Sequence, residues 1–350
     1  MKMEIISTDN MKNTLMERIY AKAKANPKRV AFPEAADLKM LQAMVEVAQN
    51  GYANVVVVGN IEEVKKIVSE NKIDDSKFEY LDHMDETYQQ DVLKRYLQLP
   101  GIIYGEKSLT RRMKDPLNFA LMMEAVGDVD VTFAGISSST GEFIFAAQTI
   151  IGLQDNLDTI SSVGIAELPN FTFTNGTNII AVGDCAVCTN PSANELASIA
   201  IAACDTVRAV TGFEPKCAML SYSTCGSGSG ELVDKVVSAI KIAKERRPDL
   251  KIDGEFQLDS AIIPEVAKKK VKRESEVAGQ ANILIFPDLN AGNIGVKLIQ
   301  RFGNADAYGP LLQGFKKICS DCSRGAPVSE LVGNIAISVV RAGELENGKN

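Results

Sequence analysis

The sequence predicts an α/β protein with two α/β domains, the first of them doubly wound. The chain has 350 residues, which is more than one ordinary hydrophobic core organises. Segments with helical spacing of apolar residues alternate with short apolar runs that suit strands. One of these runs, ANVVVVG at residues 53–59, is rich in β-branched residues and apolar on both faces, as a buried parallel strand requires.

The elements of the first domain alternate in this way along the chain. An amphipathic helix is expected first, followed by strand, helix and strand, and further along by another helix and strand. Gly51 stops the second helix, as a glycine just past a helix end commonly does. The expected ranges are 11–25 (helix), 29–33 (strand), 38–50 (helix), 53–59 (strand), 117–126 (helix) and 129–135 (strand).

A second α/β series begins near residue 156. Its expected ranges are 178–182 (strand), 194–211 (helix), 216–221 (strand), 231–247 (helix) and 281–286 (strand). From about residue 311 we expect one loop and one helix, 328–342, and no strand series. This stretch is too short to be a domain, so we expect it to return to the first one. The predicted domains are residues 1–155 with 311–350, and residues 156–310.

Composition and charge exclude several classes of protein. The net charge is −7, so a general affinity for nucleic acid is not expected. The apolar runs are too short to span a bilayer, and residues 1–12 lack the basic start of a signal peptide, so we expect a cytoplasmic protein. His83 is the one histidine, which disfavours Ser-His-Asp, Cys-His and His-rich zinc chemistry. A general base is therefore expected to be a carboxylate.

The seven cysteines include two CxxC pairs, Cys185/Cys188 and Cys319/Cys322. Zinc ribbons have about 15–20 residues between such pairs, and these pairs lie far apart, so no metal is expected. Cys322, next to Ser323, is a hypothetical site of inhibitory oxidation.

The loop SYSTCGSGSG at residues 221–230 lies between a predicted strand and a predicted helix. Its small residues allow backbone N–H groups to approach an anion at the helix N-terminus, and a flexible surface turn fits equally well. Residues 253–259 hold three acidic groups, Asp253, Glu255 and Asp259. They suit a metal site or an acid–base pair, and a solvated or structural loop is the stronger interpretation.

Two loops carry more polar side chains after a strand. The loop FPDLNAGNIG, residues 286–295, has more polar groups than one helix cap needs, which favours a ligand loop containing Asn290 and Asn293. The run GISSSTG contributes the hydroxyls of Ser137, Ser138 and Ser139. They suit phosphate or sugar oxygens, or an ordinary capped turn.

The last candidate is the segment SDCSRGAPVSE, residues 320–330. Arg324 suits bidentate binding of a phosphate, with the hydroxyl of Ser323 donating to the same ligand. Glu330 falls in the first turn of a predicted helix, where the helix dipole favours a carboxylate. A helix-dipole contact of Glu330 and a surface ion pair of Arg324 remain the alternative.

Several long runs, occurring in family order, resemble the phosphate acetyltransferase (phosphotransacetylase) and phosphate butyryltransferase family. The resemblance covers nearly the whole chain and is strongest from about residue 215 onward. The matching runs are FPE (32–34), VVVVGN (55–60), LMMEAVGDVD (121–130), AMLSYST (218–224), DGEFQLDSAIIPEVA (253–267), VAGQANILIFPDLNAGNIG (277–295), AYGPLLQG (307–314) and SRG (323–325).

The resemblance implies two α/β domains with an active-site cleft between them, in the architecture of the isocitrate and isopropylmalate dehydrogenases, and a homodimer. It implies acyl-CoA plus phosphate giving acyl phosphate plus CoA, with coenzyme A as a substrate and no cofactor. Ser323 and Arg324 match the catalytic pair of the family, and Glu330 stands where the family usually has an aspartate. Tyr308 and Asn293 are further candidates for the acyl phosphate pocket.

Two departures leave the acyl group open. Ile144 aligns with a substrate-contacting arginine of the family. A second family arginine, near Gly101, has no match in register, and Arg95 is the nearest arginine. Acetyl is the main prediction, and propionyl or butyryl the runner-up. A second class of protein that the sequence leaves open is a non-catalytic paralogue that binds CoA. A third class is an NAD-dependent decarboxylating dehydrogenase. Such an enzyme needs a metal-binding aspartate cluster and a nucleotide-binding loop, and we find neither pattern in this sequence.

Overall fold

The computed structural model describes residues 14–347, and the chain divides into two compact units. Unit 1 comprises residues 14–15 and 155–314, and unit 2 comprises residues 16–154 and 315–347. Residues 11–13 of the first predicted helix lie outside the described residues. Within residues 14–347, each helix is too short or too polar to cross a bilayer.

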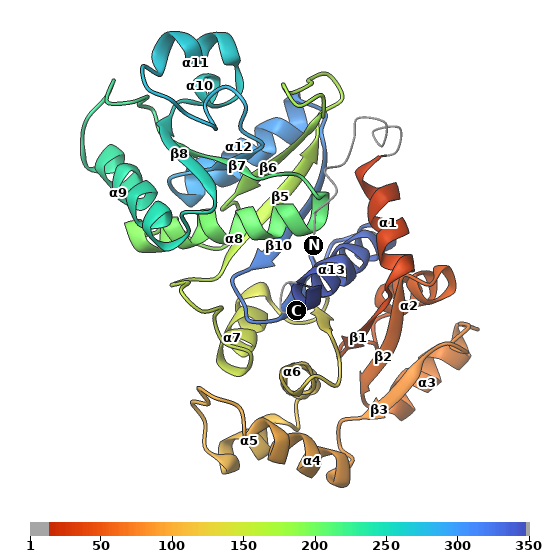
Figure 1. The fold of residues 1–350 in the computed structure, drawn as a ribbon. Coiled ribbons are helices and arrows are strands. Elements are labelled where there is room, and N and C mark those ends of the chain that lie inside the picture. The colour runs from red at the N-terminus through yellow and green to blue at the C-terminus, as the bar shows by residue number, and fades with distance from the viewer. Residues whose placement is uncertain (1–13, 348–350) are drawn as a thin grey trace. The chain divides into compact units, whose positions relative to one another are not determined.

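Unit 2 is organised around a parallel sheet with the order β11-β4-β1-β2-β3 (Figure 1). Because every strand runs in the same direction, all of their carboxyl ends lie at one edge of the sheet. The strands are β1 (Lys28–Phe32), β2 (Ala53–Gly59), β3 (Glu79–Asp82), β4 (Val131–Ala134) and β11 (Ile318–Asp321).

Helices cover both faces of this sheet. Helices α2 and α13 pack together on one face, and α6, with α7 beside it, packs on the other. Asp37 caps α2 by accepting from two backbone N–H groups, and Gly51 ends it in the left-handed conformation. The helices are α1 (Leu15–Ala25), α2 (Leu38–Asn50), α3 (Ile61–Glu70), α4 (Glu86–Tyr96), α5 (Glu106–Arg112), α6 (Pro116–Val126), α7 (Thr140–Ile150) and α13 (Val328–Asn347).

Unit 1 has a mixed sheet with the order β10-β5-β6-β9-β7-β8. Strand β5 is antiparallel to both β10 and β6, and the remaining pairs are parallel. The strands are β5 (Ser161–Glu167), β6 (Ile179–Gly183), β7 (Lys216–Leu220), β8 (Lys251–Phe256), β9 (Ile283–Ile285) and β10 (Asp306–Gln313). The helices are α8 (Ala193–Thr211), α9 (Glu231–Arg246), α10 (Leu258–Ile262), α11 (Pro264–Lys270) and α12 (Leu289–Phe302).

The α/β class is confirmed, and several strands were not recognised from the sequence. Strands β5 and β10 of unit 1 were not recognised, and its sheet is mixed because β5 runs antiparallel to both β10 and β6. The segment after residue 311 does contain a strand, β11, which forms an edge of the sheet of unit 2. Its sequence, ICSD, is short and only half apolar, so it lacks the run of hydrophobic residues from which a buried strand is recognised.

Candidate active site

Three loops meet at the carboxyl edge of the sheet in unit 2. Strands β11, β4 and β1 are neighbours and parallel, so the segments that follow them lie side by side. These segments are residues 33–37 after β1, 135–139 after β4 and 322–325 after β11. The structure thus brings Ser137, Ser138 and Ser139 to the same edge as Ser323 and Arg324.

The backbone of the Ser323-Arg324 segment is held in place while the two side chains are exposed. The Ser323 Oγ accepts from Gly325 N at 3.3 Å, which leaves the hydroxyl proton free to donate elsewhere. Lys39 Nζ donates to the carbonyl of Arg324 at 3.0 Å. Among residues 14–347, the Arg324 guanidinium makes no hydrogen bond or ion pair, so the predicted surface ion pair of Arg324 does not occur there.

Glu330 lies in the first turn of α13, close to this segment. Its backbone N–H donates to Pro327 O at 3.0 Å, and the side chain reaches solvent. Partial burial of the carboxylate raises the pKa of Glu330 above its ordinary value. A carboxylate with a raised pKa is a stronger base than an ordinary surface glutamate, which suits it to accept a proton from a thiol.

The serine loop differs from the expectation. The carboxylate of Glu34, which follows β1, accepts four consecutive backbone N–H groups of this loop at 2.7–3.0 Å, from Gly135 to Ser138. The Ser138 hydroxyl also donates to Glu34 at 2.6 Å. The backbone donors that a phosphate would need are therefore already engaged by a side chain of the protein.

The other two hydroxyls of the loop have different surroundings. Ser139 caps α7, and its N–H and hydroxyl both donate to Glu142. These hydrogen bonds lower the pKa of Glu142, and the positive charge of Arg324 adds to the effect. Ser137 is exposed, and its hydroxyl makes no hydrogen bond within residues 14–347. Of the three predicted serines, Ser137 has the hydroxyl that is free to contact a substrate.

Asp321 links the serine loop to the Ser323-Arg324 segment. Its Oδ2 accepts from Thr140 Oγ1 at 2.6 Å, and its Oδ1 is buried without a hydrogen-bond partner in the described part of the chain. Burial raises the pKa of Asp321 to about 6; the hydrogen bond from Thr140 opposes this shift and the charge of Glu34 adds to it.

Cys322 is buried at 5% exposure, and burial raises the pKa of its thiol far above the ordinary value, with the neighbouring carboxylates adding to the shift. A buried thiol that stays protonated reacts slowly with oxidants. The hypothesis that oxidation of Cys322 controls the site is therefore not supported by its surroundings.

The remaining predicted site residues, Asn290, Asn293 and Tyr308, belong to unit 1. Asn290 is exposed on α12, whose first turn is capped by Asp288. Asn293 Nδ2 donates to the carbonyl of Cys185 at 3.1 Å, and Tyr308 Oη donates to Glu167 Oε2 at 2.9 Å. Each of these two contacts orients a polar side chain through a donor.

The acidic residues of the 253–259 segment have structural partners. Asp253 and Glu255 are buried in β8, which was expected to be a loop. Glu255 Oε1 accepts from Ser223 Oγ at 2.7 Å and Gly226 N at 2.8 Å, so it organises the 221–230 loop. Among residues 14–347 no three His, Cys, Asp or Glu side chains are placed to hold a metal ion together.

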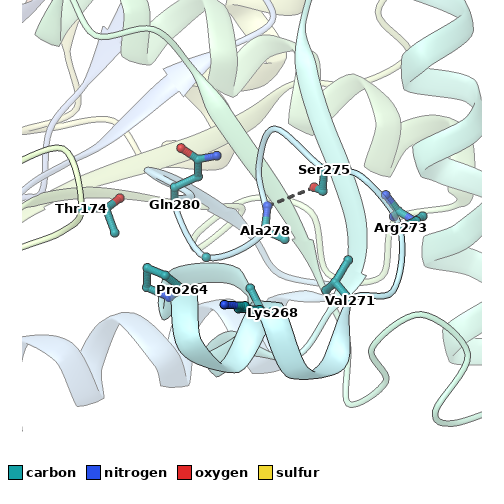
Figure 2. A pocket seen from close by; sticks show the side chains of 10 residues that line it. Thr174, Pro264, Lys268, Val271, Arg273, Ser275, Ala278 and Gln280 are labelled. Atoms are coloured by element: carbon teal, nitrogen blue, oxygen red, sulfur yellow. Dashed lines mark hydrogen bonds between the residues drawn. The ribbon is translucent and has the colours of Figure 1, made fainter.

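A cavity of about 440 Å³ lies in unit 1 beside α11 (Figure 2). Pro264, Lys268 and Val271 line one side, and Arg273 and Gln280 lie at its margin. Arg273 is already engaged by Asp253. None of the predicted site residues lines this cavity, so we assign it no part in the chemistry.

The sequence matches a known family over most of its length. The sequence model of the family described as "Phosphate acetyl/butaryl transferase" matches residues 14–339 of this chain. The chain belongs to this family. A phosphate acetyltransferase from Clostridium acetobutylicum is 41% identical over 332 residues, covering 94% of this chain and 98% of that protein.

Solved structures agree with this family and with the predicted architecture. A phosphotransacetylase from Streptococcus pyogenes superposes with a TM-score of 0.85 at 31% identity, covering 97% of this chain and all of that one. A protein from Salmonella typhimurium described as a 4-hydroxythreonine-4-phosphate dehydrogenase has a TM-score of 0.53 at 11% identity, over 90% and 99% of the two chains. The second likeness concerns the fold alone and confirms the dehydrogenase-like architecture.

Glu34, Lys39 and Asp321 were missed as members of the site. Glu34 lies two residues after the end of β1. The serine loop was singled out because polar residues just past a strand often bind ligands, and the same reasoning applied to Glu34. Asp321 ends β11, which was not recognised as a strand. The contact of Lys39 with Arg324 joins residues 285 positions apart and leaves no signal in a single sequence.

Proposed function

We propose that this protein transfers an acetyl group between coenzyme A and inorganic phosphate. The observation that carries the proposal is the segment after β11. There the Arg324 guanidinium, without a hydrogen-bond or ion-pair partner among residues 14–347, and the Ser323 hydroxyl are followed along the chain by Glu330 in the first turn of α13, a carboxylate whose pKa is raised. The family of the chain and its relation to phosphate acetyltransferases support the same reaction.

Glu330 is the proposed general base. It takes the proton from the thiol of coenzyme A, because the thiolate is the effective nucleophile. The thiolate sulfur attacks the carbonyl carbon of acetyl phosphate and forms the new C–S bond. The bond between that carbon and the bridging oxygen breaks, and inorganic phosphate leaves with the electron pair. Both substrates are bound at once, so the protein carries no acyl group.

Ser323 and Arg324 stabilise the charge that develops in this step. The Ser323 hydroxyl keeps its proton for the carbonyl oxygen, which becomes an oxyanion as sulfur attacks. Arg324 binds the phosphoryl oxygens in the planar, bidentate manner that a guanidinium allows.

The substrate-binding residues remain part of the proposal. Ser137 contributes a free hydroxyl, whereas Ser138 and Ser139 act through the shape of their loop. Asn290, Asn293 and Tyr308 are the proposed substrate contacts in unit 1. The reaction needs no cofactor or metal, and its use of coenzyme A fits the cytoplasm.

We also propose that the protein works as a homodimer. Helix α12 exposes three large apolar side chains at a spacing of four residues, Ile294, Leu298 and Phe302, with exposed fractions of 57%, 49% and 85%. Such a stripe on one helix face suits contact with a second copy. Sedimentation of the parent and of Phe302→Asp tests this proposal. A parent of monomeric mass would contradict it.

The function is tested by the rate of phosphorolysis of acetyl-, propionyl- and butyryl-CoA. We expect kcat/KM to be greatest for acetyl-CoA. An optimum at propionyl or butyryl would contradict the acetyl assignment. Absence of turnover with all three would mean that the chain binds rather than transforms acyl-CoA.

A further inference from the structure

We propose that Glu34 is a positioning residue of the acyl-transfer site and acts on Ser323 and Arg324 through the neighbouring strand ends of the same sheet. The inference rests on the function proposed above. Glu34 makes no hydrogen bond to Ser323, Arg324 or Glu330 among residues 14–347, and its influence on them runs through the contacts described next.

The first contact joins the strand ends of β1 and β4. One oxygen of Glu34 accepts three consecutive N–H groups, and the other accepts one N–H and one hydroxyl. An isosteric glutamine would keep one accepting oxygen and turn an NH₂ donor towards the remaining donors, so it would break part of the set. The distances to Gly135 N, Ile136 N, Ser137 N, Ser138 N and Ser138 Oγ are 2.9, 2.7, 3.0, 2.8 and 2.6 Å.

The second contact joins the strand ends of β4 and β11. The loop that Glu34 holds leads directly into α7, whose first residue, Thr140, donates to Asp321. The approach of the two strand ends is close: a Cβ on Gly135 would lie 1.9 Å from Asp321 Oδ1, and the φ of Gly135 is +105°. A glycine is required there, and a small shift of the loop would displace Asp321.

The third contact joins Cys322 to the end of β4, and α2 adds a contact to Arg324. Cys322 N donates to Ala134 O at 3.0 Å, which continues the ladder between β11 and β4 up to the residue before Ser323. Lys39, five residues after Glu34, holds the carbonyl of Arg324. The Ser323-Arg324 segment is therefore held at Cys322 by the end of β4, next to the loop that Glu34 organises, and at Arg324 by Lys39 of α2.

The charge of Glu34 adds a second consequence. Because its carboxylate occupies the backbone donors of the serine loop, an anionic substrate finds negative charge there. The Arg324 guanidinium, on the segment after the neighbouring strand β11, has no hydrogen-bond or ion-pair partner among residues 14–347. Phosphoryl oxygens are therefore directed to Arg324 and away from the serine loop.

The test measures kcat and KM for acetyl phosphate and coenzyme A in the parent, Glu34→Gln and Glu34→Ala, with and without formate at constant ionic strength. Formate is a small carboxylate that fits the space vacated in Glu34→Ala. Asp85→Asn is the matched control, because Asp85 also accepts two backbone N–H groups in unit 2, at the start of α4. Glu34→Gln is also measured in a Ser323→Ala background.

We expect Glu34→Gln to lower kcat on the order of 100-fold, as a misplacement of about 1 Å can, with KM for coenzyme A nearly unchanged. Formate should restore part of the activity of Glu34→Ala and none of that of Glu34→Gln. The loss from Glu34→Gln should shrink when Ser323 is already alanine, because coupled residues are not additive. Asp85→Asn should keep the parent rate.

Two results would overturn the inference while leaving the proposed function intact. One is a parent-like kcat for Glu34→Gln. The other is an equal fold-loss from Glu34→Gln in both backgrounds, which would mean that Glu34 only stabilises the fold. A parent without turnover would overturn the proposed function itself, and with it this inference. If Glu34→Ala does not fold, Glu34→Gln and its double variant decide the question.

Discussion

The two units hold two aspartates in contrasting ways. Asp253, in β8 of unit 1, is 5% exposed and is surrounded by donors: Arg273 binds it with two nitrogens at 2.7 and 2.8 Å, and Lys244 and Ser275 complete the set. Asp321, at the end of β11 in unit 2, has one hydroxyl donor and a second oxygen without a partner in the described residues.

The pKa values of the two aspartates follow from these surroundings. Burial alone would raise the pKa of Asp253, but the hydrogen bonds from Arg273, Ser275 and Lys244 lower it below the ordinary value. For Asp321 burial prevails and raises the pKa to about 6. The carboxylate of unit 1 stabilises its fold, whereas unit 2 keeps a poorly compensated carboxylate two residues from Ser323, beside the proposed chemistry.

The largest effect is expected at Glu330, a second carboxylate of unit 2 with a raised pKa and the one to which the proposed mechanism gives the role of base. Glu330→Gln should lower kcat/KM by about 10²–10⁴-fold, because the thiol loses its base. In the parent the rate should fall as the pH drops through the raised pKa of Glu330, since the protonated acid cannot accept a proton. A pH profile of kcat/KM for parent and variant checks this. An acid limb that persists in Glu330→Gln would assign it to another group.

Asp253 provides the stability side of the comparison. Asp253→Asn should lower the free energy of unfolding by about 3 kcal/mol, because Arg273 and Lys244 lose their shared buried partner. Urea unfolding measures the change. The matched control is Asp249→Asn, which removes an exposed partner of Arg247 and should cost less than about 1 kcal/mol. Equal losses of unfolding free energy in Asp253→Asn and Asp249→Asn would contradict the stabilising role assigned to Asp253.

Asp321 should give the smallest effect, and with the opposite sign. Its folded pKa of about 6 lies above the ordinary value, so its favourable contribution exists at low pH and is lost as the pH rises through about 6. Asp321→Asn should therefore be more stable than the parent by about 1 kcal/mol at neutral pH, and should lose that advantage in acid. Unfolding curves at several pH values test this. A loss at neutral pH as large as that of Asp253→Asn would contradict it.

Sequence patterns predicted much of the fold because its main elements are strongly marked. The bounds of α2 and β2 agree with the prediction, since Asp37 and Gly51 delimit the helix and a β-branched run marks the strand. Strand β11 was missed because four residues carry little periodic signal. Strand β8 was taken for a loop because acidic residues in a sequence usually indicate a solvated segment. Its acids are buried in the fold because partners from other segments, such as Arg273, bind them, and the local sequence does not show those partners.

The candidate site was predicted in part. Ser323, Arg324 and Glu330 were proposed from their residue types and from the family resemblance, and they stay a prediction. The serine loop was located correctly at a strand end, but the carboxylate that fills it is about 100 positions away in sequence, and only the order β11-β4-β1 brings the two together. The order of strands in a parallel sheet determines which loops lie side by side, and that strand order cannot be read from a single sequence.

The most direct test of the central claim is the initial rate of thioester formation from acetyl phosphate and coenzyme A, in the parent and in the double variant Ser323→Ala, Arg324→Ala. We expect rapid turnover in the parent and a loss of at least about 10²–10³-fold in the variant, since both stabilising groups are gone. A variant that keeps the parent rate would show that the segment after β11 does not carry the reaction.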